Sequence, residues 1–282
     1  MSTHRGDTVL ITGASSGIGK VTALHLAELG YDVIGTSRLT ARLADLEAEA
    51  SARGLSVSGV EMDVNSDAAV AGVMAGLIDE HEGVDVLVNN AGYGLWGPVE
   101  LLSVEEIKAQ FETNFFAAVR LIKTVLPGMV KRGSGKIINM SSVEGRLATP
   151  FSGAYAASKF ALEGMSEALR TELRPFGVFV SVVQPGLFRT EFQKNQVVGE
   201  GVESTADVSH YAPYIDAYRA KRGRYEWLVS DPIAVARVVH KIVRSRRPAF
   251  RHPVGIEARL GMVGARLIPE RIFQALVGRA TM

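Results

Sequence analysis

The segment Thr8-Val-Leu-Ile-Thr-Gly-Ala-Ser-Ser-Gly-Ile-Gly19 decides the fold, because it joins an apolar run to a glycine-rich turn. The run Thr8–Ile11 is typical of a buried strand, and Ile18–Glu28 behind the turn has a helical pattern. The glycines permit a tight turn and let the backbone approach a pyrophosphate, whose charge the N-terminus of the next helix attracts. Glycine turns are common in many folds, but this one lies between a strand and a helix that is followed by a second strand. The sequence therefore predicts a phosphate-binding cradle made by Gly13, Ser15, Ser16, Gly17, Ile18 and Gly19.

Short apolar runs alternate with longer amphipathic segments through most of the chain. Several runs are apolar without strict alternation, which indicates strands covered on both faces of a parallel sheet. The expected strands are Thr8–Ile11, Asp32–Thr36, Ser56–Glu61, Val84–Val88, Lys136–Met140 and Phe179–Val183. The expected helices between them are Ile18–Glu28, Ala41–Ala52, Asp67–Glu80, Val104–Lys131 and Ala154–Leu173. This order predicts an α/β fold of the Rossmann type, a doubly wound parallel sheet in three α/β/α layers, built as one domain over residues 1–282.

The regular alternation stops after Gly186 and resumes with a helical pattern at Ile233–Val243. Residues 187–230 lack clear strand periodicity and are rich in aromatic side chains. A stretch of this length without strands of its own usually covers or borders a site. We therefore expect residues 187–230 to form a substrate-binding lid inserted after the sixth strand. Extra helices packed on the outside are the alternative.

The composition excludes several classes of function. The chain has 282 residues, a net charge of +1 and no cysteine, so disulfides, thiolate catalysis and cysteine-bound metals are excluded. The six histidines lack metal-ligand spacing, so no metal site is expected. The near-neutral charge argues against a nucleic-acid partner, and the basic run Arg244–His252 is interpreted as a solvated face. Because we find neither an export signal nor an apolar window of about 20 residues, we expect a cytoplasmic protein without a membrane span.

The end of the second expected strand indicates which dinucleotide is bound. Enzymes that use NAD place an acidic residue there, about 20 residues beyond the glycine turn, to hold the ribose 2′-hydroxyl. This chain instead has Gly35-Thr-Ser-Arg38, without a carboxylate. The guanidinium of Arg38 suits a 2′-phosphate, so Ser37 and Arg38 predict NADP(H) as the cofactor. A solvated start of the next helix is the alternative interpretation of Arg38.

Ser142, Tyr155 and Lys159 form a second constellation. Tyr155 and Lys159 are four residues apart, which places them on one face of a helix. A free tyrosine has a pKa of about 10, so we expect the positive charge of Lys159 and of an oxidised nicotinamide to lower it. Ser142 ends the preceding strand, and we expect its hydroxyl to hold the substrate oxygen. Lys159 is also expected to bind the nicotinamide ribose.

With the Gly-x-x-x-Gly-x-Gly spacing of the cradle, these motifs resemble the short-chain dehydrogenase/reductase family. The segments Tyr155–Gly164 and Arg174–Val178 look most similar to the 17β-hydroxysteroid and retinol dehydrogenase branch. The resemblance implies that Asn114 is a fourth catalytic residue, which anchors a proton-relay water. It also implies further cofactor contacts at Asp63, Val64, Asn90, Ala91, Gly92, Tyr155, Lys159, Pro185, Gly186 and Thr190.

The implied activity is hydride transfer between NADP(H) and a carbonyl or alcohol carbon, with Tyr155 as the general acid or base. The expected site rim would favour an apolar substrate that resembles a steroid, a retinoid or a lipid. The expected substrate contacts are Ser142, Leu95, Trp96, Val143, Leu147, Phe151, Leu187 and Phe192. A catalytically silent NADP(H) sensor or scaffold, and an NAD(H)-dependent dehydrogenase of small ketones or quinones, are the alternatives. The resemblance also implies a homo-dimer or homo-tetramer built through Val104–Lys131 and Ala154–Leu173.

Overall fold

A parallel sheet forms the centre of the protein, seen here in a computed structural model that describes residues 7–81, 83–192, 195–205, 210–222 and 229–281. Seven strands of the described part join this sheet in the order β3-β2-β1-β4-β6-β7-β9. Their bounds are β1 Thr8–Thr12, β2 Asp32–Ser37, β3 Val57–Glu61, β4 Val86–Asn89, β6 Gly135–Met140, β7 Val178–Pro185 and β9 Arg251–Val254. Each neighbouring pair is parallel, so all carboxyl ends of the strands meet at one edge. This arrangement confirms the predicted Rossmann-type fold.

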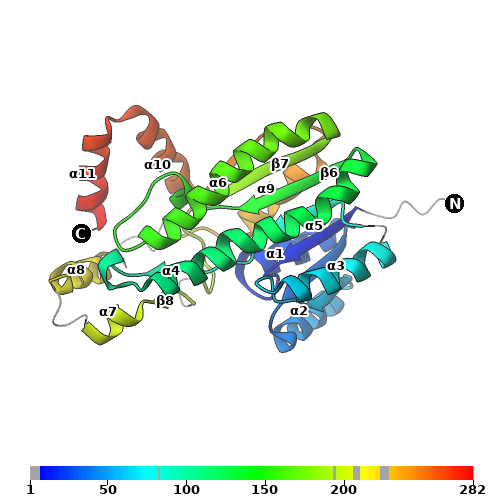
Figure 1. Cartoon of the computed structure of the whole chain (residues 1–282), viewed down its shortest axis with the longest axis horizontal. Helices are drawn as coiled ribbons and strands as arrows, with labels where there is room; N and C mark the ends of the chain where they lie inside the picture. Colours follow the sequence, from blue (N-terminus) through cyan, green and yellow to red (C-terminus); the bar gives the residue numbers. More distant parts are fainter. Residues whose placement is uncertain (1–6, 82, 193–194, 206–209, 223–228, 282) are drawn as a thin grey trace.

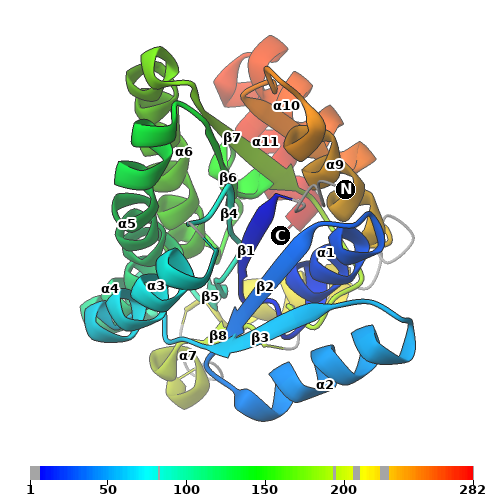
Figure 2. The same ribbon diagram turned by 90° about the vertical axis from the view of Figure 1, so that its right-hand side faces the viewer.

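Helices cover both faces of the sheet, as Figure 2 shows end-on. One face carries α1 (Gly17–Glu28), α2 (Thr40–Ala52) and α9 (Ile233–Arg244), whose apolar side chains share a buried core with the strands. The other face carries α3 (Asp67–His81), α5 (Ala117–Arg132) and α6 (Gly153–Leu173), which build a second core. The strands read as continuous apolar runs in the sequence because they are buried on both faces.

The predicted helix Val104–Lys131 is interrupted. It consists of α4 (Val104–Phe111), a π-helical turn η2 (Glu112–Phe116) and α5. A π-turn inserts one extra residue per turn, and such turns are frequent at functional sites. The hydrophobic pattern alone did not reveal this turn, which contains the buried Asn114.

The prediction missed strand β9, which lies inside the basic run Arg244–His252 and beyond it. Pro253 and the two polar residues before it hide the strand, because proline is tolerated only on the edge of a sheet, where β9 lies. Arg251 is therefore not part of a merely solvated face: its guanidinium binds Glu163 at 3.0 Å and Glu167 at 2.7 Å on α6.

The region 187–230 does contain a strand, contrary to our expectation. β8 (Val197–Val198) pairs with β5 (Leu95–Trp96) in a two-stranded sheet, followed by the helices α7 (Glu200–Thr205) and α8 (Ala212–Arg222). Residues 193–194, 206–209 and 223–228 of this region lie outside the described part of the chain. Two further helices, α10 (Ile256–Leu267) and α11 (Glu270–Thr281), end the chain, and α11 lies against α8 (Figure 1). No described helix is long and apolar enough to cross a membrane.

Candidate active site

A cavity of about 1200 Å³ lies at the carboxyl edge of the sheet. It lies where the strand order reverses between β1 and β4, the place at which doubly wound sheets bind their ligands. Nearly all of the predicted catalytic and cofactor-binding residues line it. They are Gly13, Ser15, Ser16, Gly17, Ile18, Ser37, Arg38, Val64, Asn90, Ala91, Gly92, Ser142, Tyr155, Lys159, Pro185, Gly186 and Thr190. Three predicted residues do not line this cavity: Gly19, Asp63 and Asn114. Their contacts with neighbouring residues are described below.

The glycine turn is shaped for close approach by a ligand. Gly13 and Gly17 have φ values of +64° and +53°, in the left-handed region that favours glycine. A Cβ atom on Gly19 would lie 2.3 Å from the carbonyl oxygen of Gly13, so Gly19 allows the helix to pack against the turn. Asn90 fixes the turn from β4, because its side-chain amide donates to the carbonyls of Thr12 and Gly13 at 2.9 and 3.2 Å.

Two arginines lie at the ribose end of the cavity. The Ser37 hydroxyl donates to the Ser15 hydroxyl at 3.0 Å, and Arg38 lies beside them in the cavity wall. Sequence analysis missed Arg42, which lines the same end and forms an ion pair with Glu191 at 3.9 Å across the cleft. Its position on the first turn of α2, directly after the predicted 2′-phosphate segment, is the signal that would have identified it.

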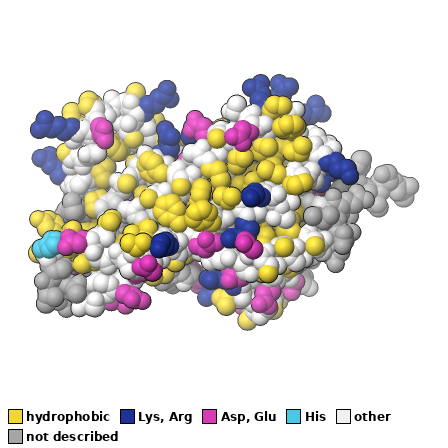
Figure 3. All heavy atoms as spheres, viewed as in Figure 1, with side chains coloured by type: hydrophobic (Ala, Val, Ile, Leu, Met, Phe, Trp, Pro, Cys, Tyr) yellow, Lys and Arg dark blue, Asp and Glu magenta, His cyan; other side chains and the backbone are white. Residues whose placement is uncertain are grey.

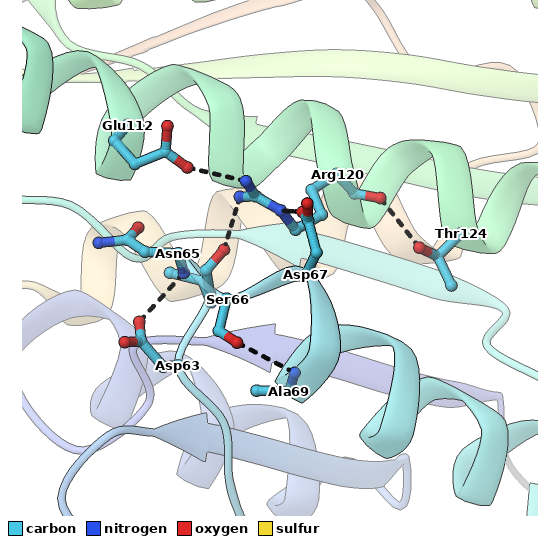
Figure 4. Close-up of polar contacts among 9 residues, drawn as sticks. Asp63, Asn65, Ser66, Asp67, Ala69, Glu112, Arg120 and Thr124 are labelled. Carbon is cyan, nitrogen blue, oxygen red and sulfur yellow. Dashed lines mark hydrogen bonds and ion pairs between the residues drawn. The ribbon is translucent and has the colours of Figure 1, made fainter.

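A network around Arg120 holds the loop after β3, the predicted adenine end (Figure 4). Arg120 donates to the carbonyl oxygen of Val64 at 2.9 Å and bridges the carboxylates of Asp67 and Glu112. Asp63 accepts the backbone N–H of Asn65 at 3.0 Å, so its carboxylate shapes the loop, whereas Val64 and Asn65 face the cavity.

Ser142, Tyr155 and Lys159 meet in the cavity wall. Tyr155 and Lys159 come from α6, and Ser142 is the second residue after β6. The hydroxyls of Ser142 and Tyr155 form a hydrogen bond, and the Lys159 Nζ lies 5.7 Å from the Tyr155 ring centre. Lys159 also donates to the carbonyl oxygen of Met140 at 2.9 Å. The predicted constellation is thus assembled by the fold.

The electrostatics of this group differ from our expectation. Burial raises the pKa of Tyr155, the nearby Glu144 raises it further, and the hydrogen bond from Ser142 lowers it. We expect Lys159 together with an oxidised nicotinamide to lower the pKa of Tyr155, whereas the residues of the chain alone raise it. Burial also lowers the pKa of Lys159 to about 8. The phenol therefore stays protonated at neutral pH in this state, ready to act as an acid.

Asn114 lies behind Lys159 rather than in the large cavity. The π-turn aims its side chain at Tyr93, whose backbone N–H donates to it at 3.1 Å and whose carbonyl accepts from it at 3.0 Å. Asn114 also donates to the Ser158 hydroxyl at 3.1 Å. A separate internal cavity of about 10 Å³, about the size of one water molecule, is lined by both Asn114 and Lys159.

The turn Pro185–Gly186 is held by a residue that sequence analysis missed. Glu257, at the start of α10, accepts the backbone N–H of Leu187 at 2.6 Å. A Cβ atom on Gly186 would lie 2.1 Å from the Glu257 carboxylate, so a larger residue here would displace that carboxylate. No sequence signal links Glu257 to this turn, because 70 residues separate it from Leu187.

The predicted substrate contacts fall into two groups. Val143, Leu187 and Phe192 line the cavity together with Ser142, and the Phe192 ring centre lies 5.6 Å from that of Tyr155. Leu95, Trp96 and Phe151 do not line it, because they are buried in the packing behind it; Trp96 packs on Phe151 and Tyr218. Leu147 lies outside the lining too, beside Gly261 of α10. Further side chains at this end are Tyr93, Phe188, Asn195, Gln196, Val197, Tyr218, Lys221 and Val229.

Comparison with known proteins identifies the family. Residues 7–200 match the family model described as short chain dehydrogenase. The chain belongs to the short-chain dehydrogenase/reductase family. This confirms the family that the motifs resembled, and the relatives of this short-chain dehydrogenase include the retinol dehydrogenases of the expected branch.

Three similar proteins illustrate the relationship. A 3-ketodihydrosphingosine reductase of Bacteroides thetaiotaomicron is 41% identical over 88% of this chain and 87% of its own. Human retinol dehydrogenase 8 is 41% identical over 88% of this chain and 81% of its own. The structure of a variant actinorhodin polyketide ketoreductase with NADPH superposes with a TM-score of 0.76, at 28% identity, over 90% of this chain and 97% of the other. The chain is therefore an oxidoreductase by family.

Proposed function

We propose that this oxidoreductase uses NADP(H) to interconvert a carbonyl and an alcohol on an apolar substrate, with Tyr155 as the general acid or base. The observation that carries the proposal is the meeting of Ser142, Tyr155 and Lys159 in one cavity wall with the glycine turn and Arg38. A relative whose structure contains NADPH and relatives named as a retinol dehydrogenase and a ketodihydrosphingosine reductase support it.

The residues of the cavity fit the dinucleotide. A Cβ atom on Gly13 would lie 2.9 Å from the backbone of Ala91, so the turn can pack this closely on the loop after β4 only with glycine at this position. Arg38 and Arg42 supply two cations where a 2′-phosphate would lie, and Arg42 is 3.9 Å from the carboxylate of Glu191. Lys159 and Thr190 would hold the nicotinamide half.

Each catalytic side chain has a defined task in this mechanism. The Tyr155 hydroxyl gives its proton to the carbonyl oxygen in reduction and, as phenolate, takes the alcohol proton in oxidation. Ser142 hydrogen-bonds the same oxygen, and the ammonium of Lys159 stabilises the phenolate. Bound NADP(H) supplies the hydride donor or acceptor.

We propose that protons reach Tyr155 through Lys159 and a water molecule beside Asn114. Lys159 connects the phenol side of the site with the small internal cavity, which Asn114 also lines. A water molecule of the size of that cavity would link the ammonium of Lys159 to the amide of Asn114.

The substrate end favours an apolar molecule. Val143, Leu187, Phe188 and Phe192 provide apolar surface beside Tyr155. We infer a substrate that resembles a lipid, a retinoid or a steroid, and we assign the cover of this end to residues 187–230.

The proposal is tested by NADPH consumption across a panel of long-chain ketones, retinal, steroid ketones, small ketones and quinones, each repeated with NADH. We expect turnover of the large apolar ketones, faster with NADPH than with NADH. Tight binding of NADPH without turnover of any member would favour a sensor or scaffold. Faster turnover of small ketones or quinones with NADH would favour the NAD(H) alternative.

A further inference from the structure

Glu144 is an acidic side chain of the reaction cavity that the proposed mechanism does not use. It lies in the 3-10 turn η3 (Val143–Gly145), two residues after Ser142, and it lines the same cavity. Its backbone N–H donates to the Ser142 hydroxyl at 3.1 Å. Its carboxylate lies close enough to Tyr155 to act on the charge of that phenol. Glu144 thus adjoins both groups that hold the substrate oxygen.

Neutral partners fix the carboxylate in place. The Thr149 hydroxyl donates to Glu144 Oε1, and Ser152 forms a second hydrogen bond with the same carboxylate. Thr149 and Ser152 belong to the segment that leads into α6, so the side chain is anchored to the helix that carries Tyr155. Two hydroxyl donors leave several lone pairs of a carboxylate free.

No cation balances this charge within the described part of the chain, where neither a lysine nor an arginine forms an ion pair with Glu144. The ammonium of Lys159, on the same helix as Tyr155, donates to the Met140 carbonyl instead. Burial raises the pKa of Glu144 to about 7, because its surroundings solvate the negative charge less well than water does. A half-buried carboxylate of this kind gains most from a cation that arrives with the ligand.

We propose that Glu144 is a specificity-determining residue, which receives a protonated amine that the substrate carries next to its reacting carbonyl. The position beside the carbonyl follows from Ser142 and Tyr155, because both hold the carbonyl oxygen and Glu144 adjoins both. The apolar wall of Val143, Leu187 and Phe192 takes the rest of such a molecule, which is an amino ketone with a hydrocarbon chain. The inference rests on the proposed function, since it assumes that a carbonyl reacts at Tyr155.

The test compares three medium-chain ketones of equal length: the unsubstituted ketone, its α-hydroxy derivative and its α-amino derivative added as the hydrochloride. The ratio of kcat/KM for the amino ketone to that for the unsubstituted ketone is measured with NADPH for the wild type, Glu144→Gln and Glu172→Gln. We expect the wild type and Glu172→Gln, a remote carboxylate on the exposed side of α6, to prefer the amino ketone. Glu144→Gln should lower the ratio by about 10- to 100-fold, the loss typical of a charge-assisted hydrogen bond.

Two results would overturn the inference. One is a wild type that does not prefer the amino ketone over its neutral α-hydroxy analogue, a comparison that needs no variant. The other is an unchanged ratio in Glu144→Gln. If no ketone is reduced, the proposed function fails, and calorimetric titration with the same ketones tests the inference separately. The wild type must then still bind the amino ketone more tightly than the unsubstituted ketone. Glu144→Gln must bind the two ketones with similar affinity.

Discussion

At the residue scale, the proposed function assigns the choice between the two dinucleotides to Arg38. Replacing it in Arg38→Asp puts a carboxylate where a 2′-phosphate would lie and favours a ribose 2′-hydroxyl instead. We expect the affinity for NADPH to fall by roughly 10- to 100-fold, the effect of losing a charge-assisted contact, while the affinity for NADH rises. Fluorescence titration with both dinucleotides measures the change, and Arg53→Asp, on the far end of α2, is the control. An unchanged preference would exclude Arg38 from the site.

The charge of Glu144 also predicts how stability depends on pH. Its pKa rises from 4.5 in the unfolded chain to about 7 in the folded protein, so the folded state binds this proton more tightly. The stabilisation from Glu144 is complete below about pH 4.5 and is lost as the pH rises through about 7. Glu144→Gln cannot ionise at this position. The free energy of unfolding of the variant, relative to that of the wild type, should therefore be higher at pH 8 than at pH 5 by about 1–3 kcal/mol. Urea unfolding of both proteins at pH 5 and pH 8 measures this change. The same difference between variant and wild type at both pH values would contradict the raised pKa of Glu144.

At the element scale, strand β9 is tied to the catalytic helix α6 by one arginine. Arg251 bonds the carboxylate of Glu163, which is only 3% exposed and which Gln184 also contacts at 2.8 Å. Arg251→Met leaves this buried charge without its cation, so we expect a loss of about 2–4 kcal/mol in the free energy of unfolding. Glu167→Gln removes the exposed partner of the same arginine and should cost less than about 1 kcal/mol. Similar losses in both variants would contradict the account.

The elements that the sequence revealed are those with a strong local pattern. The central strands of the main sheet, β1, β4 and β7, are buried apolar runs, and the Tyr155 and Lys159 pair has helical spacing, so both could be predicted within a few residues. Strand β9 escaped because Arg251 and Pro253 mask it, and its pairing with β7 is a contact across about 70 residues of sequence. The π-turn at Asn114 escaped because a hydrophobic period does not show one inserted residue.

The residues of the site also divide into those that the sequence predicts and those that it does not. Motif residues such as Gly13 and Ser142 could be predicted because their chemistry requires a particular residue type at a particular spacing. The substrate end could not, since Trp96 and Phe151 have the character of rim residues and yet pack behind the cavity. The contact of Glu257 depends on tertiary structure, which brings a distant helix to the turn after β7.

At the scale of the whole molecule, an apolar surface crosses the face shown in Figure 3, over α4, α5 and α6. Its exposed members include Val104, Phe116 and Phe160, each more than 45% exposed. Large apolar patches mark association sites, and the family resemblance predicts an oligomer through these helices. We expect the double substitution Phe116→Glu and Phe160→Glu to yield a monomer, as measured by sedimentation velocity. Phe176→Glu, at an exposed phenylalanine beyond the end of α6, is the control. A wild type that is already monomeric would contradict this prediction.

The central claim, proton transfer by Tyr155 in NADPH-dependent carbonyl reduction, is tested most directly in a single turnover. Enzyme loaded with NADPH is mixed with the best ketone of the panel, and the loss of NADPH absorbance is followed for the wild type and Tyr155→Phe. At saturating NADPH, our account predicts a rate about 10²- to 10⁴-fold lower in the variant, the usual contribution of a general acid. A variant that oxidises NADPH as fast as the wild type would contradict it.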